Sequence, residues 1–401
     1  MCTKIPFFTL LTSWNNNISH FLHPTNVFFL RKKKKKTKNL EDRLFFINFA
    51  NKQNKPMDLS IIIPIYNVEK YIRTCLESVF QQGLDESCFE VIIVNDGSTD
   101  RSMEMIADII HQHENTMVIN QENQGLSVTR NNGIKAAKGE YILMLDSDDL
   151  LIENSLKPLL EKAIKTKVDL VVADFLSMTD EEIQHNKIHP QQQTEFDYKE
   201  KTGEELFIQD LNPYQCYVWR TLFKREFLIE NNLYFIPGIY IQDVPFTHEC
   251  YLKASKCLRT PWLFHLYRKG HESATFSFNK KKVKDFCTAI AKTWELTNLD
   301  GLSSEAQNKL RDDIFISFSL MVRIAVYALK DASDRIEVVD FLKQQVPDLW
   351  FRNGIVQKSI SYMYRYLPHS FIKLRFLYAI IVEKKFRTFI NHWFRRPSLQ
   401  K

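Results

Sequence analysis

The sequence predicts an α/β protein: a mostly parallel sheet flanked by helices, followed by a helical C-terminal region. From Leu59 onward, short runs rich in β-branched residues alternate with segments of helical period. This alternation is typical of parallel strands connected by helices that cover both faces of the sheet. Beyond residue 203 aromatic residues become frequent, and beyond residue 276 long helical patterns dominate.

The elements can be placed in chain order. Leu59–Ile65 and Glu90–Val94 are continuous apolar runs of strand length, and two later runs have the same character. We expect strands at 59–65, 90–94, 141–145 and 168–173. Between and after them, helical spacing of apolar residues predicts helices at 69–82, 99–113, 127–137 and 153–165. Residues 175–203 are polar and suggest an inserted loop or irregular hairpin. Further helices are expected at 244–254, 280–298, 304–329, 335–345 and 370–394.

The formal charge of +6, from 54 basic and 48 acidic residues among 401, is unevenly distributed. Residues 1–56 carry 11 basic and 2 acidic side chains, and residues 365–401 carry 9 and 1. The body between them, 57–364, has 34 basic and 45 acidic side chains, a net charge of −11. Because nucleic-acid binding needs positive charge on the folded face, the sequence argues against a nucleic-acid partner.

The first 56 residues look like an extension outside the folded protein. Their basic block, Arg31–Lys36, follows the apolar residues instead of preceding them, which is wrong for a secretory signal. Met57 resembles an ordinary start, so we interpret 1–56 as a non-native extension, the alternative being a disordered tail.

Seven scattered cysteines without a Cys-x-x-Cys pair suit the reducing cytoplasm. The longest apolar run near the end, Phe376–Val382, is too short to span a bilayer.

Polar residues cluster after three of the predicted strands. Ligands bind parallel sheets at the carboxyl ends of their strands, so these residues form a candidate site. Asp146-Ser-Asp-Asp149 places three carboxylates after one strand, and hard oxygen ligands suit Mg²⁺ or Mn²⁺. The alternative is a helix cap with solvated neighbours.

Two further segments add candidate ligand groups. Asp96 follows the second strand and has an acceptor suited to the imide N–H of uracil, with the Tyr66 ring nearby. Gly97-Ser-Thr by itself is explained by a turn and a helix cap. Arg130 follows the Gly125 turn and has the paired donors that grip a diphosphate, although a lone arginine is usually a solvated charge.

Taken together, these segments resemble glycosyltransferase family 2. The resemblance rests on Ser60-Ile-Ile-Ile-Pro-Ile-Tyr-Asn67, Val94-Asn-Asp-Gly-Ser-Thr-Asp100, Asn123-Gln-Gly-Leu, Arg130-Asn-Asn-Gly133 and Leu145-Asp-Ser-Asp-Asp149. It is close over about residues 58–175 and looser to about 275. Asn95 and Thr129 stand where Asp and Ala are common in the family.

The resemblance implies a GT-A fold, a nucleotide-sugar donor, most often UDP-linked, and a divalent cation, Mg²⁺ or Mn²⁺. It also implies a donor-binding set and a metal ligand, Asp148. The donor-binding set is Pro64, Tyr66, Asn67, Glu69, Asp96, Gly125, Arg130 and Asp146. The implied domains are 57–275 for the glycosyltransferase domain, divided into 57–175 for the donor and 203–275 for the acceptor, and 276–401 for the helical region.

The resemblance also implies a catalytic base. Inverting transfer needs a carboxylate that takes the proton of the attacking hydroxyl. Family members carry this base in a Glu-Asp pair before an apolar helix, and Asp243 occupies its position here. Gln242 stands where the family usually has the Glu of this pair. A helix N-cap is the structural alternative for Asp243. On the acceptor side we expect Trp219, Gln242 and Arg268, with a core position as the alternative for Trp219.

The sequence favours an inverting glycosyltransferase that extends a glycan or lipid-linked glycan acceptor in surface polysaccharide biosynthesis. The alternatives are a non-catalytic nucleotide-sugar-binding or scaffold protein and, third, a nucleotidyltransferase.

Residues 370–395 mix apolar and basic side chains, as do helices that lie in an anionic membrane surface, although a docked terminal helix fits equally. We therefore expect a cytoplasmic protein with peripheral contact at the inner face of the cell membrane.

Overall fold

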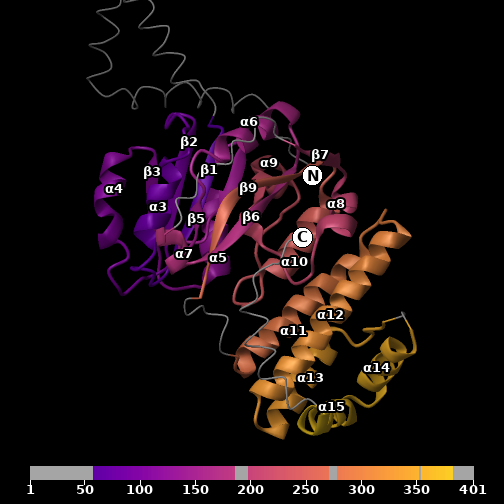
Figure 1. Cartoon of the computed structure of the whole chain (residues 1–401). Helices are drawn as coiled ribbons and strands as arrows, with labels where there is room; N and C mark the ends of the chain where they lie inside the picture. The colour runs from indigo at the N-terminus through magenta and orange to yellow at the C-terminus, as the bar shows by residue number, and fades with distance from the viewer. Residues whose placement is uncertain (1–56, 186–196, 271–277, 352–353, 383–401) are drawn as a thin grey trace, which may run out of the picture. The chain divides into compact units, whose positions relative to one another are not determined.

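The computed structural model describes residues 57–185, 197–270, 278–351 and 354–382 (Figure 1). The extension expected at 1–56 and residues 383–394 of the last expected helix lie outside these ranges.

Within these described ranges the sheet has nine strands, in the order β3-β2-β1-β4-β8-β6-β9-β5, with β7 paired to β9. The strands are β1 Leu59–Ile65, β2 Phe89–Asn95, β3 Thr116–Asn120, β4 Tyr141–Met144, β5 Leu150–Leu151, β6 Leu170–Thr179, β7 Lys199–Lys201, β8 Thr221–Lys224 and β9 Cys257–Lys269. The chain runs from β1 outward to β3 and then returns to β4 on the other side of β1. This reversal creates the switch point at which open α/β sheets bind ligands.

Alternate residues of the strands enter two separate hydrophobic cores. Ile61 and Ile63 face the core under α3 (Ile72–Phe80), η1 (Glu104–Ile106), α4 (Ala107–Gln112) and α6 (Leu156–Thr166). Ile62 faces the other core, under α5 (Leu126–Ala136), α8 (Gly203–Asp210), α9 (Arg225–Glu230) and α10 (Asp243–Lys253). The two-residue period of a strand therefore produces a sheet covered on both faces.

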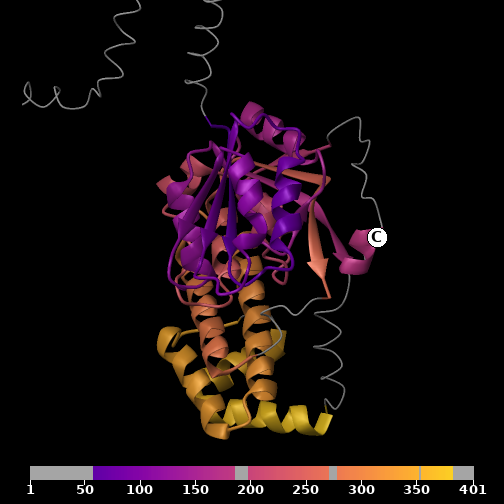
Figure 2. The same cartoon turned by 90° about the vertical axis from the view of Figure 1, so that its left-hand side faces the viewer.

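In the part of the C-terminal region that the structure describes there are five α-helices, coloured orange to yellow in Figures 1 and 2. They are α11 Lys280–Glu295, α12 Ser304–Ala328, α13 Ala332–Gln345, α14 Gly354–Tyr366 and α15 Pro368–Val382, with the short η4 Leu296–Asn298 after α11. Their buried side chains belong to the same core as α5 and α10. Contacts of α11 with α10, and of α12 with α8, join this region to the sheet domain.

The predicted α/β class with a helical C-terminal region is confirmed, but the sheet is mixed. Strands β1 to β4 are parallel, whereas β8 runs antiparallel to both β4 and β6. We did not predict β8 or β9. Four residues are too few for a periodic pattern in β8, and Pro261 interrupts the donor pattern of β9. The β6–β9 register shifts at this point: Val172 pairs with Arg259, and Asp174 pairs with Leu263.

Other differences are local. Strand β3 and helices α8, α9 and α14 were also unexpected, and the polar segment after residue 175 contains the end of β6, α7 (Asp180–His185) and β7. The helix expected at 99–113 is the short pair η1 and α4 instead. Residues 218–220 form η2 (Val218–Arg220).

Candidate active site

The carboxyl ends of β2, β1 and β4 lie side by side, because these three strands are neighbours and parallel. Tyr66, Asp96 and Asp146 follow these ends at one edge of the sheet. Helix α5 packs closely against β1, since a Cβ added to Gly133 would lie only 2.3 Å from Cγ2 of Ile62. This close packing brings Arg130 of α5 to the same edge.

Arg130 joins the two halves of the candidate site. Its Nη2 donates to Oδ1 of Asp146 at 2.6 Å, and its Nη1 donates to Oδ1 of Asp243 at 2.6 Å. The arginine side chain is 1% exposed, whereas the two carboxylates are 28% and 34% exposed. Phe235 lies 5.2 Å from the guanidinium carbon and covers the cation. Both carboxylates therefore have a water-accessible side and a side fixed by one buried cation.

The electrostatics of this arrangement favour a proton acceptor at Asp243. Desolvation raises the pKa of Asp243, Arg130 opposes that rise, and Asp146 adds to it, leaving the pKa above its ordinary value. The pKa of Arg130 is also raised: burial lowers it, but the two carboxylates outweigh burial. A carboxylate of raised pKa beside a permanent cation is suited to accept a proton from a hydroxyl.

Arg130 was expected to grip a diphosphate. In this structure both of its terminal nitrogens donate to aspartates, so it acts as their counterion. The donor-binding role of Arg130 remains a prediction.

Asp96 is almost fully buried and binds the turn before α5. Its Oδ1 accepts from Gln121 Nε2 at 2.7 Å and from the Gln124 N–H at 2.8 Å, and its Oδ2 accepts from the Gly125 N–H at 2.9 Å. Gly125 has φ of 85°, which glycine adopts without strain. Asp96 therefore positions the Gly125 turn, and its contact with a base remains a prediction.

The predicted donor-binding residues in and after β1 differ in how far their side chains are exposed to solvent and in what they contact. Pro64 is buried within β1, whereas Tyr66 is 50% exposed and offers a free ring at the edge. The Asn67 Oδ1 accepts from the Thr99 N–H at 2.8 Å. The Glu69 Oε2 accepts from the Arg101 N–H at 3.0 Å. Asn67 and Glu69 thus connect the loops after β1 and β2.

The far side of the Asp146–Asp149 loop is fixed to β9. Asp149, 1% exposed, accepts from His265 Nε2 at 2.9 Å and from the Arg268 N–H at 2.8 Å. The Arg268 Nε donates to the carbonyl oxygen of Asp148 at 2.7 Å, and its guanidinium lies over the Tyr71 ring. Arg268, expected on the acceptor side, therefore supports the carboxylate loop from behind.

His265 is a neutral partner in this support. A carboxylate oxygen accepts hydrogen bonds, so we assign the hydrogen of this bond to His265 Nε2. Burial lowers the pKa of His265 to about 3, although Asp146 and Asp148 oppose the shift, and Nδ1 is buried without a hydrogen-bond partner.

Trp219 lies within an aromatic stack. It is 3% exposed, and its ring is nearly parallel to those of His265, 4.0 Å away, and Tyr217, 4.7 Å away. This packing fits the core alternative for Trp219 better than stacking on an acceptor sugar.

Two contacts between α5 and the second half were not predicted. The Ser127 hydroxyl donates to Oε1 of Gln242, which is buried beside Asp243. Asn131 exchanges two hydrogen bonds of 2.8 Å with the backbone of Phe235. Ser127 and Asn131 lie on either side of Arg130 in the sequence and are four residues apart. This spacing places both side chains on one face of a helix, so the sequence contained a signal for these contacts.

The carboxylates at the end of β4 fit a divalent cation that binds together with a diphosphate. Asp146 is partly exposed, and Asp148 stands two residues later at the same strand end. Within the described residues, no group of three or more His, Cys, Asp or Glu side chains is arranged to hold a metal ion. Mg²⁺ usually takes one or two protein carboxylates and completes its shell with phosphate oxygens and water, so this donor set suits it.

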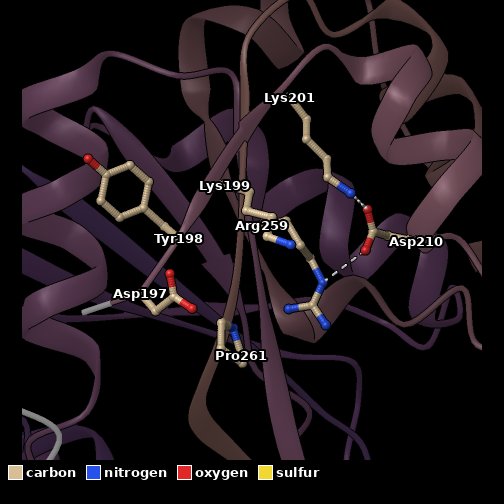
Figure 3. Close-up of a pocket in the computed structure, with 7 residues that line it drawn as sticks. All are labelled: Asp197, Tyr198, Lys199, Lys201, Asp210, Arg259 and Pro261. Carbon is tan, nitrogen blue, oxygen red and sulfur yellow. Dashed lines mark hydrogen bonds and ion pairs between the residues drawn. The ribbon is translucent and has the colours of Figure 1, made fainter. Parts of the chain in front are cut away.

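A cavity of about 260 Å³ lies elsewhere, at the β7–β9 edge (Figure 3). Lys201 bonds to Asp210, and the Arg259 Nε lies 3.4 Å from Oδ1 of Asp210. The Arg259 Nη2 bonds to Asp174 at 2.6 Å. None of the predicted site residues lines this cavity, and we assign it no ligand.

Comparison with known proteins agrees with this geometry. The family model described as "Glycosyl transferase family 2" matches residues 60–229. The glycosyltransferase GlyG of Streptococcus pneumoniae is 31% identical over 228 residues, which cover 53% of this chain and 70% of that protein. The poly(ribitol-phosphate) beta-glucosyltransferase of Bacillus spizizenii is 32% identical over 203 residues, 50% of this chain and 30% of that protein.

The chain spans 62% of the length of two further curated relatives. A crystal structure of Staphylococcus aureus TarS, residues 1–349, in complex with UDP-GlcNAc has a TM-score of 0.63 at 21% identity. That match covers 80% of this chain and 91% of that one, which shows that the two share the GT-A fold. With the fold, the family match and the relationship to GlyG in agreement, the chain belongs to glycosyltransferase family 2.

Proposed function

We propose that this protein transfers a sugar from a UDP-sugar to a hydroxyl of a glycan or lipid-linked glycan, with inversion, in surface polysaccharide biosynthesis. The observation that carries the proposal is the pair of 2.6 Å bonds that Arg130 makes to Asp146 and Asp243. They hold the candidate donor-binding carboxylate and the candidate base around one cation. The relationship to a poly(ribitol-phosphate) glucosyltransferase supports a cell-surface acceptor, and the fold shared with TarS, whose complex contains UDP-GlcNAc, supports a UDP-linked donor.

Transfer is then a single in-line displacement. The acceptor oxygen forms a bond to the anomeric carbon while the bond from that carbon to the diphosphate oxygen breaks. The proton of the acceptor hydroxyl goes to the Asp243 carboxylate, and the electron pair of the breaking bond leaves with UDP. The raised pKa of Asp243 favours this proton transfer, and Arg130 orients the carboxylate without entering the reaction.

The other site residues bind the donor or hold the loop that binds it. Asp148 would hold Mg²⁺ or Mn²⁺, which neutralises the charge of the leaving diphosphate when it is bound. Tyr66 supplies an exposed ring for the uracil, and Asp96 maintains the Gly125 turn beside it. Asp149, His265 and Arg268 keep the carboxylate loop in place from behind.

Membrane contact is part of the proposal. A lipid-linked acceptor requires access to the bilayer surface, and we assign this contact to residues 370–395 at the inner face of the cell membrane. Within the described residues, no helix has the length and apolar character needed to cross a membrane.

The test measures release of UDP and of pyrophosphate from UDP-GlcNAc and other UDP-sugars, with Mg²⁺ or Mn²⁺. We expect UDP release by the native protein and a loss of about 10²- to 10⁴-fold in Asp243→Asn. UDP binding, followed by calorimetry, should persist in that variant. Asp108→Asn is the matched control, because Asp108 forms an exposed pair with Arg73 away from the site.

Each alternative function predicts a different outcome. A binding or scaffold protein would bind UDP-sugars but release no UDP even in the native form. A nucleotidyltransferase would release pyrophosphate. Either result contradicts the proposal, as would an Asp243→Asn variant that transfers at the native rate.

A further inference from the structure

Exposed apolar side chains gather at the C-terminal end of the described chain. Twelve large apolar side chains are exposed in the described ranges, and eight of them lie between residues 355 and 378. This segment comprises α14 and α15, which pack against each other (Figures 1 and 2). Contiguous apolar exposure of this kind marks an interaction surface, whereas single exposed apolar residues are ordinary.

Helix α14 has one face turned inward and an apolar face turned outward. Tyr364 is buried and donates its hydroxyl hydrogen to the carbonyl oxygen of Val346 at 3.1 Å. Ile355, Tyr362 and Tyr366 recur at i, i+7 and i+11, which places them on one stripe of the helix. Ile355 is 81% exposed and Tyr366 is 59% exposed. The stripe therefore lies opposite the core and has no cover within the described residues.

Helix α15 is apolar on both its faces. Phe371 and Ile372 are buried, and the Phe371 ring packs on Phe318 of α12. Leu374 and Leu377, one turn apart on the outer side, are each more than half exposed. The outer apolar side chains of α15 therefore have no cover within the described residues.

The charge of this segment indicates the environment that these exposed side chains suit. Residues 354–382 contain four Lys or Arg side chains and no Asp or Glu, although the body 57–364 has a net charge of −11. The cations are Lys358 and Arg365 on α14 and Lys373 and Arg375 on α15. Apolar and tyrosine side chains interspersed with cations match the boundary between acyl chains and anionic head groups.

We propose that α14 and α15 form one lipid-facing surface that binds an anionic bilayer. The lipid-facing surface consists of the exposed residues of 355–378. It extends the membrane contact proposed above from residues 370–395 back to α14, and it rests on that part of the proposed function. The lipid-facing surface would bring the enzyme to an acceptor that is anchored in the bilayer.

The test is flotation of the full chain with two kinds of vesicle: phosphatidylcholine alone, and equal parts of phosphatidylcholine and phosphatidylglycerol. The native protein should float with the anionic vesicles, less so as salt rises, and little with phosphatidylcholine alone. Ile355→Asp combined with Tyr366→Asp should weaken partitioning about tenfold or more, because two apolar side chains no longer insert. Contact confined to residues 370–395 predicts no such loss.

The matched control is Ile229→Asp combined with Tyr214→Asp. These side chains are 42% and 48% exposed outside the lipid-facing surface, and their substitution changes the net charge by the same amount. The control should float like the native protein. Equal losses in the two double variants would show a general charge effect and overturn the proposal.

A second variant of the lipid-facing surface tests the proposal even if the first variant fails to fold. Lys358→Gln combined with Lys373→Gln should weaken partitioning into anionic vesicles by about fivefold for each charge removed. Native-like flotation of both surface variants would overturn the proposal. A different pair of results would also overturn it: the native protein does not float and sediments as a dimer, and the Ile355→Asp/Tyr366→Asp variant sediments as a monomer. The surface would then join two copies of the chain. UDP release needs no vesicles, so failure of the lipid-facing surface and failure of the proposed reaction are distinguishable.

Discussion

The two sides of the Asp146–Asp149 loop are built differently although they belong to one four-residue motif. On one side, Asp146 shares the buried Arg130 with Asp243, and both carboxylates stay partly exposed. On the other side, Asp149 is buried and bonded to His265 and to the backbone of Arg268. We call these the arginine side and the histidine side of the loop.

The difference shows two ways in which neighbouring carboxylates can be stabilised at the end of a strand. A single buried cation compensates the two carboxylates that face solvent, whereas a neutral imidazole and a backbone N–H satisfy the third. The arginine side is therefore held by charge and the histidine side by hydrogen bonds, so the two should respond differently to mutation and to pH.

The largest effect is expected on the arginine side. Arg130→Met leaves Asp146 and Asp243 facing each other without a cation, which should lower the free energy of unfolding by about 3–5 kcal/mol. Arg73→Met is the control, because its pair with Asp108 is exposed and screened by solvent, so its loss should change the free energy of unfolding far less. Urea unfolding of both variants measures the difference. An equal loss of unfolding free energy in Arg130→Met and Arg73→Met would contradict a special role for the buried Arg130.

The second effect is a pH dependence from the histidine side. The pKa of His265 is lowered to about 3 in the folded protein, so as pH falls the unfolded chain takes up the proton first. The stability that this neutral histidine contributes is present above pH 6.5 and is lost progressively as the pH falls from 6.5 to 3. Unfolding free energies of His265→Gln, measured over this range, should depend less on pH. His111→Gln, at an exposed position, should match the native profile; a profile unchanged in His265→Gln would refute the assignment.

The smallest effect is expected from the aromatic stack behind His265. Trp219→Phe keeps an aromatic ring but loses contact area, so unfolding should become easier by roughly 1 kcal/mol. The KM for the acceptor should stay unchanged, because the Trp219 ring is covered. A raised acceptor KM with unchanged stability would instead favour the acceptor-side interpretation.

Much of the secondary structure in residues 57–175 was predictable from sequence because these elements are local. Strand β1 was placed at its observed bounds, and α5, α6, α10 and α12 within three residues of theirs. The strands at the sheet's second half were not, since β8 is four residues long and β9 contains Pro261. Such strands are stabilised by their neighbours in the sheet and have little periodicity of their own.

The same division applies to the site. The residue types and their positions after strands identified Asp96, Arg130, Asp146 and Asp243 as candidates. The pattern could not show that Asp96 binds a turn, that Arg268 supports the loop from behind, or that Trp219 is covered. These are contacts between residues tens to more than a hundred positions apart, and hydrophobic periodicity contains no information about them.

The sequence by itself determined the family resemblance, the alternation of strands and helices, and the set of polar residues at the strand ends, because each depends on local spacing. Only the tertiary structure decided which of those residues face one another. Arg130 meets Asp146 across 16 residues and Asp243 across 113. That meeting requires α5 to pack on β1, and α10 to pack on the same face of the sheet, since a buried arginine is stable only where both carboxylates reach it.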